Sequence, residues 1–331
     1  MSTIGLVAIG RNEGTRLHRC LESVVKQADA VVYVDSGSTD DSVEFAASLG
    51  VDVVKLDLSI PFTAARARNA GVERLLELNP DLDYVQFIDG DCEVVEGWLG
   101  NAQQILNDRP DVAVVCGRRR ERFPEASVYN QICDIEWDTP VGEANACGGD
   151  AMMRMHAFQK VQGFNAELIA GEEPELCVRL RQQGWKILRI DADMTLHDAQ
   201  MTQFGQWWKR AQRAGFAFAQ GSWLHGRSPQ KHRVKESRRI WLWGFGLPLV
   251  ILAGLPLSHG FSLALLAGYP VSAARTSRYI SRRGYEGKAA LWYGVLCTLG
   301  KFPELQGQLQ FHVGRLLKRQ QTLIEYKTEG S

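Results

Sequence analysis

The sequence predicts an α/β fold with a mostly parallel central sheet, followed by a helical region of different character. Short apolar runs alternate with stretches of helical spacing over the first part of the chain, which is typical of parallel strands joined by crossover helices. After about residue 200 this alternation gives way to long apolar and basic stretches. We therefore expect two regions, residues 1–202 and residues 203–331.

The elements of the first region are assigned from local signals. A helix is expected at 15–28, where apolar residues recur at helical spacing, and another at 64–78. The turn "SGSTDDS" leads into a further helix, which Asp40 is expected to cap. Strands are expected at the apolar runs 4–9, 30–35, 51–58 and 84–89.

The charge of the chain is divided between the two regions. The whole sequence has a formal net charge of +0, but residues 1–205 carry −14 and residues 206–331 carry +14. Such asymmetry indicates that the two parts meet different partners. The acidic part suits a metal site, whereas the basic part suits a negatively charged surface.

The seven cysteines are scattered and form no Cys-x-x-Cys pair. This pattern argues against a zinc site or a disulfide framework and favours a reducing compartment. The first residues, "MSTIGLVAIGRNEG", lack the basic start and long apolar run of a signal peptide. We therefore expect the N-terminal region to stay in the cytoplasm.

Polar residues follow the ends of the predicted strands. Asn12 and Glu13 come after the first strand, Asp35 ends the second, and "DGD", with Asp89 and Asp91, ends the fourth. In open α/β sheets, ligands bind at this carboxyl edge. Two neighbouring carboxylates repel each other unless a cation lies between them, so this edge is a candidate metal and ligand site. The alternative for "DGD" is an ordinary tight turn.

The helix expected at 64–78 begins with Arg66 and Arg68, where the helix dipole and the side chains could both attract phosphate. The loop "GRNEGT" does not fit the glycine pattern of a classical dinucleotide fold. Neither a Walker loop, a Gly-x-Ser-x-Gly elbow nor a His-Glu-x-x-His motif occurs.

The C-terminal region combines aromatic, basic and apolar stretches. "FGQWWKRAQRAGFAFAQG" is typical of an interfacial helix. Two apolar runs follow, at 240–257 and 261–274, with arginines before the first and after the second. If both flanks stay on one side, the pair forms a hairpin that dips into a membrane. The alternative is a pair of buried core helices.

Taken together and in order, these motifs resemble the inverting family 2 nucleotide-sugar glycosyltransferases. The motifs are "VAIGRNEG", "VYVDSGSTDDS", "AARARNAG", "FIDGDCE", "CGGDAMMR", "GFNAELIAGEEPELCVRLRQQGW" and "LH", and they cover about residues 2–200. The resemblance implies a nucleotide-diphosphosugar-binding domain of the GT-A type, followed here by an α-helical, membrane-associated C-terminal region.

The resemblance also implies a role for individual residues. Asp35 would contact the nucleobase, Asp89 the donor ribose or sugar, and Asp91 would bind Mn²⁺ or Mg²⁺, with Asp89 and His197 as further metal positions. Glu173 or Glu172 would be the catalytic base, a choice that the sequence leaves open. The other implied donor-binding residues are Gly10, Arg11, Asn12, Glu13, Arg68, Asn69 and Gly90, and the acceptor-side residues are Gly148, Gly149 and Asp150.

The sequence thus predicts a metal-dependent inverting glycosyltransferase at the cytoplasmic face of the cell membrane. Its donor would be a UDP-sugar by family habit, and its acceptor a hydroxyl of a lipid-linked or surface-glycan molecule. Nucleic acid is not expected as a partner, and a homo-oligomer is left open. The chain lacks the Gln-x-x-Arg-Trp motif of processive synthases, so it should add one or a few sugars. The alternatives are a sugar-nucleotide-forming nucleotidyltransferase and a non-catalytic membrane-surface protein of the same fold.

Overall fold

The computed structural model describes residues 2–318, which divide into two units. The first unit contains residues 2–123 and 136–200, and the second contains residues 124–135 and 201–318. The change at 200/201 falls two residues before the boundary predicted at 202/203. The segment 124–135, which carries η1 (Pro124–Ala126) and most of α5 (Val128–Trp137), counts with the second unit.

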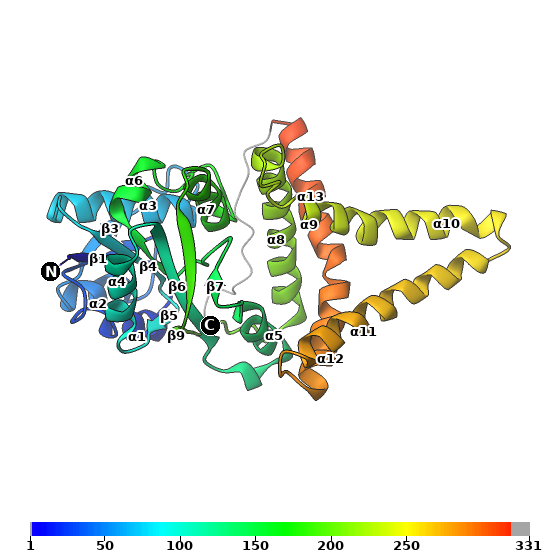
Figure 1. Ribbon diagram of the computed structural model, residues 1–331, viewed down its shortest axis with the longest axis horizontal. Helices are drawn as coiled ribbons and strands as arrows, with labels where there is room; N and C mark the ends of the chain where they lie inside the picture. The colour runs from blue at the N-terminus through cyan, green and yellow to red at the C-terminus, as the bar shows by residue number, and fades with distance from the viewer. Residues whose placement is uncertain (1, 319–331) are drawn as a thin grey trace. The chain divides into compact units, whose positions relative to one another are not determined.

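The first unit is built around one nine-stranded sheet (Figure 1). Its order is β3-β2-β1-β4-β8-β6-β9-β5, with β7 also paired to β9. The strands are β1 Ile4–Gly10, β2 Ala30–Asp35, β3 Asp52–Lys55, β4 Tyr84–Asp89, β5 Cys92–Val94, β6 Val112–Glu121, β7 Gly142–Glu143, β8 Ala151–Arg154 and β9 Lys186–His197. The helices are α1 Thr15–Glu22, α2 Ser42–Ser48, α3 Ala64–Leu78, α4 Trp98–Asp108, α6 Met155–Lys160 and α7 Glu172–Gln182.

The sheet is mixed, which corrects the prediction of a mostly parallel one. Strands β3, β2, β1 and β4 are parallel, as is the pair β6 and β9. Strand β8 runs antiparallel to both β4 and β6, and β5 and β7 run antiparallel to β9. The antiparallel partners are two to four residues long, too short to give a strand signal in the sequence.

The predicted elements of the first four strands are largely confirmed. The strand at 30–35, the helix at 64–78 and the strand at 84–89 have the predicted bounds. The first helix ends at Glu22, and the third strand is limited to Asp52–Lys55. The expectation that Asp40 caps α2 is wrong: the N-cap is Asp41, which makes no side-chain cap, and Asp40 accepts hydrogen bonds from the backbone of Ser42 and of Gly14.

The core of the first unit holds these strand ends at fixed positions. Leu6, Val7 and Phe87 are completely buried in the centre of the sheet. Helix α3 lies so close to β1 that a Cβ atom at Gly71 would come within 2.3 Å of Val7 Cγ1. Because packed interiors deform little, the loops at the carboxyl ends of β1, β2 and β4 stand on a rigid base.

The second unit is helical, and two of its helices pack with backbones in contact. A Cβ atom at Gly215 of α8 would lie 1.9 Å from the carbonyl oxygen of Glu304 of α13, and one at Gly307 would lie 1.9 Å from that of Gln212. Only glycine permits this approach. The elements are α8 Phe204–His225, α9 Val234–Trp241, η2 Leu242–Gly246, α10 Leu247–Leu257, η3 Phe261–Ala267, α11 Gly268–Ser281, α12 Gly287–Leu299 and α13 Lys301–Leu316.

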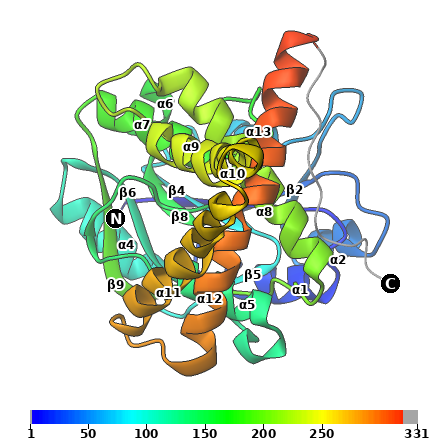
Figure 2. The same cartoon turned by 90° about the vertical axis from the view of Figure 1, so that its right-hand side faces the viewer.

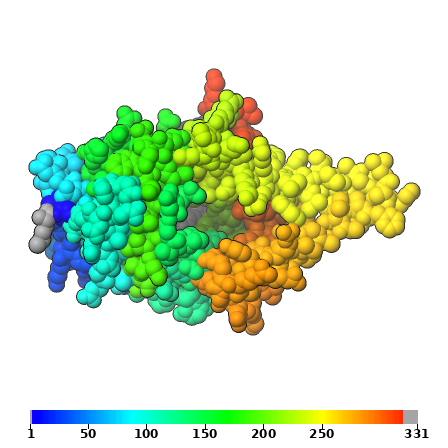
Figure 3. All heavy atoms as spheres, in the orientation of Figure 1, coloured from blue at the N-terminus to red at the C-terminus, as the bar shows by residue number. Residues whose placement is uncertain are grey.

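Within the second unit, α10, η3 and α11 form an arm that projects from α8 and α13 (Figures 1 and 2). The helix Val234–Leu257 is long and apolar enough to cross a membrane, and only 17% of its apolar window is buried. Leu257 and Phe261, at the tip, are 86% and 84% exposed. In the space-filling view the outer parts of α10 and α11 lie against each other (Figure 3). The apolar runs at 240–257 and 261–274 are therefore largely exposed in this chain rather than packed in its core.

Candidate active site

The sheet aligns three strand ends that the sequence predicted to converge. Gly10 of β1 pairs with Asp35 of β2, and Ile9 pairs with Asp89 of β4. Asp35 and Asp89 therefore stand on either side of the end of β1. Gly90 continues this close packing, because its backbone N–H donates to the carbonyl oxygen of Ile9 at 2.8 Å.

Asp35 lies at one side of this edge, beside a hollow of about 350 Å³. Its carboxylate is buried and accepts hydrogen bonds from the backbone of Gly37 and Ser38 and from the Tyr33 hydroxyl, at 3.0–3.2 Å. The hollow is lined by residues of the loop after β2, by the start of α2 and by the end of β3. It is the size of a small-molecule site.

The residues after β1 form the loop next to this hollow. Asn12 has a left-handed backbone (φ 52°), and its side-chain oxygen accepts a hydrogen bond from the Thr39 backbone at 2.7 Å. Glu13 forms an ion pair with Arg16 at 2.7 Å. The Arg11 guanidinium lies over the ring of Phe62. Asn12 therefore joins the loops that follow β1 and β2.

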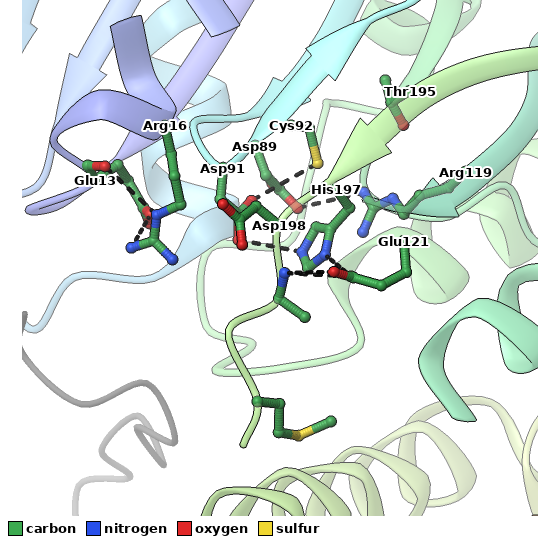
Figure 4. A network of polar contacts seen from close by, with 12 residues as sticks. Glu13, Arg16, Asp89, Asp91, Cys92, Arg119, Glu121, Thr195, His197 and Asp198 are labelled. Carbon is green, nitrogen blue, oxygen red and sulfur yellow. Dashed lines mark hydrogen bonds and ion pairs between the residues drawn. The ribbon is translucent and has the colours of Figure 1, made fainter. Parts of the chain in front are cut away.

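Asp91 and His197 come together as predicted from two different strands. Cys92 of β5 pairs with His197 of β9, so the preceding Asp91 is brought to the imidazole. Asp91 Oδ2 lies 3.1 Å from His197 Nε2, and Glu121 Oε2 lies 3.2 Å from His197 Nδ1 (Figure 4). Burial by itself lowers the pKa of His197, but Asp91 and Glu121 outweigh burial, so the net shift is upward.

This group fits a divalent cation. One ligand atom from each of Asp91, Cys92 and His197 lies within 4.8 Å of the others. A carboxylate and an imidazole are suitable ligands for such an ion, and Glu121 stands where a carboxylate commonly orients a metal-binding histidine. Asp89 is not one of the three grouped residues.

Asp89 instead lies between two arginines. Arg68 of α3 approaches Asp89 Oδ1 at 2.7 Å, and Arg119 of β6 approaches Asp89 Oδ2 at 3.4 Å. Arg119 also pairs with Asp150 at 2.7 Å. The Asp150 side chain is completely buried and accepts further bonds from Thr195 and from the Asp89 backbone. Asp150 therefore lies behind Asp89, and a direct sugar contact would need it to become exposed.

Arg68 links the Asp89 strand to the predicted base helix. Its guanidinium is buried and pairs with Glu172 Oε1 at 2.7 Å as well as with Asp89. A Cβ atom at Gly149 would come within 2.9 Å of Arg68 and 3.0 Å of the Asp89 carboxylate. The loop containing Gly149 thus passes directly over this ion pair, which only a residue without a side chain allows.

Glu173 points to a different set of partners from Glu172. Glu173 Oε1 accepts hydrogen bonds from the Cys147 backbone at 2.5 Å and from the Cys177 thiol at 3.1 Å. Gly148, with φ of +86°, follows Cys147 and is exposed. The start of α7 is thereby fixed to the loop at 147–149, and Glu173 is 6% exposed.

The side chain of Asn69 is held by a loop that is distant in the sequence. Its amide exchanges two hydrogen bonds with the backbone of Phe164, at 2.8 and 3.0 Å. Asn69 therefore ties the start of α3 to the segment before α7. In this arrangement it supports Arg68, its neighbour on the helix.

Three residues of this site escaped the sequence analysis. Glu121 ends a strand with an acid, the same signal that singled out Asp35 and Asp89, and could have been found that way. Arg119 lies within "RRRE", where nothing local distinguishes this partly buried arginine from its exposed neighbour Arg120. Cys147 carried no signal because its partner Cys177 is 30 residues away.

Comparisons with known proteins agree with this geometry. Residues 7–161 match the family model described as glycosyl transferase family 2. The chain is 26% identical to the succinoglycan biosynthesis protein ExoA of Rhizobium meliloti over 91% of this chain and 87% of that protein. It is 24% identical to the O-antigen chain rhamnosyltransferase RfbN of Salmonella typhimurium, and this match covers 56% of this chain and 62% of that protein.

The fold also resembles a solved structure. The mannosyltransferase PcManGT of Pyrobaculum calidifontis, in complex with GDP-Man and Mn²⁺, superimposes with a TM-score of 0.59. The two chains are 16% identical, and the match covers 93% of this chain and 86% of the other. At this identity the likeness concerns the fold alone.

Proposed function

This chain belongs, through residues 7–161, to glycosyl transferase family 2, and from this premise we propose that it is a metal-dependent inverting glycosyltransferase. It would move a sugar from a nucleoside diphosphate, UDP by family habit, to a hydroxyl of a lipid-linked or surface-glycan acceptor. The observation that carries the proposal is Arg68, which joins Asp89 at a strand end to Glu172 at the start of α7. One buried cation thus connects the proposed donor side to the proposed acceptor side.

The donor would lie along the carboxyl edge of β2, β1 and β4. The hollow beside Asp35 has the size and the polar lining for a nucleobase and ribose. Asp89, held between Arg68 and Arg119, would face the ribose or sugar. Because both of its oxygens are already fixed by cations, it offers the donor a pre-organised acceptor of hydrogen bonds.

A divalent cation, when bound, would act as a Lewis acid for the departing diphosphate. Asp91 and His197 would hold it, with Cys92 beside them. Glu121 would keep the His197 ring in place through Nδ1 and leave Nε2 facing the ion. The complex named for the mannosyltransferase includes Mn²⁺, and we propose Mn²⁺ or Mg²⁺ for this chain.

Glu173 is the better candidate for the base. An acceptor hydroxyl needs a positioned group to take its proton during attack on the anomeric carbon. Glu172 is already the ion-pair partner of the buried Arg68 guanidinium, whereas the partners of Glu173 are a backbone N–H and a thiol. All hydrogen bonds of Glu173 among residues 2–318 fall on Oε1, which leaves Oε2 for the acceptor. A single displacement of this kind inverts the anomeric centre.

The arm would attach the enzyme to a membrane surface. Its apolar side chains are exposed, and the hairpin brings Arg238 and Arg239 to the same end as Arg278 and Arg282, away from the apolar tip. Cations near an anionic surface contribute on the order of 1 kcal/mol each. We propose that the tip enters the cytoplasmic leaflet while the arginines stay at the headgroups, where a lipid-linked acceptor would be found.

A donor screen with the full chain in detergent tests the function. Release of nucleoside diphosphate from UDP- and GDP-sugars would be measured with Mn²⁺ and with EDTA, with a polyprenyl-phosphate acceptor present. Asp91→Ala should reduce release to background. Asp108→Ala, which changes an exposed acid at the end of α4, is the matched control and should remain active. Near-normal rates in EDTA would contradict the metal-dependent mechanism.

A further inference from the structure

A second cluster of possible metal ligands surrounds Glu173 itself. Cys147 lies just before the loop at 148–149, and Cys177 lies one helical turn after Glu173 on α7. The two thiol sulfurs are 3.7 Å apart, and Cys177 Sγ is 3.1 Å from Glu173 Oε1. One ligand atom from each of the three residues lies within 4.8 Å of the others.

The two sulfurs are too far apart for a disulfide, and their distance suits both a thiol–thiol hydrogen bond and two ligands of one soft metal ion. A disulfide needs its sulfurs at about 2 Å, whereas two thiolates bound at about 2.3 Å to one tetrahedral Zn²⁺ stand roughly 3.8 Å apart. The observed separation of 3.7 Å is close to the second case, whereas Glu173 Oε1, now 3.1 Å from Cys177 Sγ, would have to move away by about 0.5 Å to take a tetrahedral position. Two thiolates and one carboxylate leave the fourth tetrahedral position open.

The thiols of the cluster must lose their protons to bind a metal ion. The hydrogen bond from Cys147 lowers the pKa of Cys177, but burial and the negative charge of Glu173 outweigh it and raise the pKa to about 11. A third thiol, Cys116 of β6, also has its pKa raised, first by burial and then by Glu173 and Cys177. The thiols are therefore protonated in the metal-free protein, and a metal ion that binds the sulfurs of Cys147 and Cys177 would displace their protons.

The cluster is also near the protein surface. Cys147 is 9% exposed, and its neighbour Gly148 is exposed with no atom within 4 Å of the place where a Cβ would stand. Cys147 is therefore next in the chain to an exposed backbone with open space beside it.

We propose that Cys147, Cys177 and Glu173 form a binding site for a thiophilic divalent cation such as Zn²⁺, and that its occupation stops sugar transfer. The inhibitory part rests on the proposed role of Glu173 as the base, because a carboxylate coordinated to zinc no longer accepts the proton of an acceptor hydroxyl. This site shares no residue with the group of Asp91, Cys92 and His197, which presents an imidazole as well as a carboxylate and one thiol. The enzyme would thus be activated by one class of divalent cation and blocked by another.

Binding is tested with Co²⁺ alone, which replaces Zn²⁺ in such sites and shows thiolate-to-cobalt charge-transfer absorption in the near ultraviolet. The full-length protein and its Asp91→Ala variant should both show this absorption, and added Zn²⁺ should remove it. The double variant Cys147→Ser/Cys177→Ser should lack it. Cys297→Ser is the matched control, because Cys297 of α12 is a more accessible thiol outside the cluster; it should bind as the unchanged protein does.

Inhibition is tested by adding Zn²⁺ to the transfer assay at saturating Mn²⁺, with each variant compared with its own zinc-free rate. Zn²⁺ should lower the rate of the unchanged protein and of Cys297→Ser at least 10-fold. The double cysteine variant should need at least 10-fold more Zn²⁺ for the same loss. Metal content after gel filtration should give one tightly held zinc per chain, and less than half of that in the double variant.

The outcomes separate this proposal from the proposed function. Charge-transfer absorption that is missing, or that persists in the double cysteine variant, overturns the binding site whether or not the protein transfers sugar. Zinc binding by the two cysteines without any loss of transfer overturns the inhibitory part. If Glu173→Gln transfers at a normal rate, the assignment of the base is wrong, whereas the cobalt result still decides whether the site exists.

Discussion

Replacing Arg68 by Met should destabilise the first unit much more than a matched change on the same helix. Arg68 is 2% exposed and pairs at 2.7 Å with two carboxylates, Asp89 and Glu172. Removing one partner of a buried ion pair costs about 3–5 kcal/mol, because the remaining charges stay buried. The side chains of Asp89 and Glu172 are 30% and 12% exposed, so solvent screens part of this cost and we expect about 3 kcal/mol.

Arg74 provides the control for this prediction. It also lies on α3 and also contacts two carboxylates, Asp52 and Glu77, at 2.8 Å, but its side chain is 37% exposed. Exposed ion pairs are screened by solvent and contribute little to stability, so Arg74→Met should change the thermal midpoint little. For a unit of this size, Arg68→Met should lower the midpoint by roughly 6–12 °C.

The assay is thermal unfolding of the full chain in detergent, followed by circular dichroism. Adding Glu172→Gln to Arg68→Met removes one unpaired charge and should restore part of the midpoint. If Arg68→Met and Arg74→Met unfold at the same temperature, the ion pairs of Arg68 do not stabilise the site. If Glu172→Gln restores nothing, the loss comes from packing and not from charge.

Three further outcomes are expected. Glu173→Gln should reduce turnover by roughly 10²–10⁴ while donor binding, measured by calorimetry, changes little; a large loss in Glu172→Gln and none in Glu173→Gln would make Glu172 the base. In metal-free protein, the raised pKa of His197 contributes stability that is present below its unfolded value of about 6.5 and is lost as the pH rises through the folded value. The thermal midpoint should therefore fall over that range in the unchanged protein and not in His197→Gln, and an equal fall in both would exclude His197. Leu257→Asp, at the exposed tip of the arm, should shift the protein from the membrane fraction toward the supernatant in fractionation, whereas Leu78→Asp on α3 should not; equal membrane binding by both would contradict insertion of the tip.

The parts of the fold that could be predicted are the elements long enough to show a periodic pattern in the sequence. The strand 84–89 and the helix 64–78 are long enough to show their own period, and Asp35 and Asp89 stand at strand ends that a parallel sheet must align. The antiparallel strand β8 is four residues long and lies between β4 and β6. Nothing in its four residues specifies that position, so the mixed sheet could not be foreseen.

The contacts of the site depend on long-range pairing, which a single sequence does not show. Arg68 and Glu172 are 104 residues apart, and Glu121 and His197 are 76 residues apart. The position of Arg68 at a helix start suggested that it would bind phosphate, since a cation there attracts anions. The structure gives it two protein carboxylates instead, so any contact with a donor phosphate would be additional to these.

The balance of charge in the site favours the proposed binding of a cation. Two arginines, Arg68 and Arg119, and one histidine face a larger number of acids, and Asp91 and Glu121 both adjoin His197. Carboxylates this close together are unfavourable unless positive charge lies among them. In the metal-free protein a proton on His197 supplies part of that charge, and the neighbouring carboxylates are what raises the pKa of His197.

A sugar diphosphate would bring further negative charge to the same edge. A single proton on His197 balances little of this charge, whereas a divalent ion at Asp91 and His197 would balance more of it. Donor and metal should therefore bind more tightly together than either does alone. The acids of the site are Asp89, Asp91, Glu121, Asp150, Glu172 and Glu173.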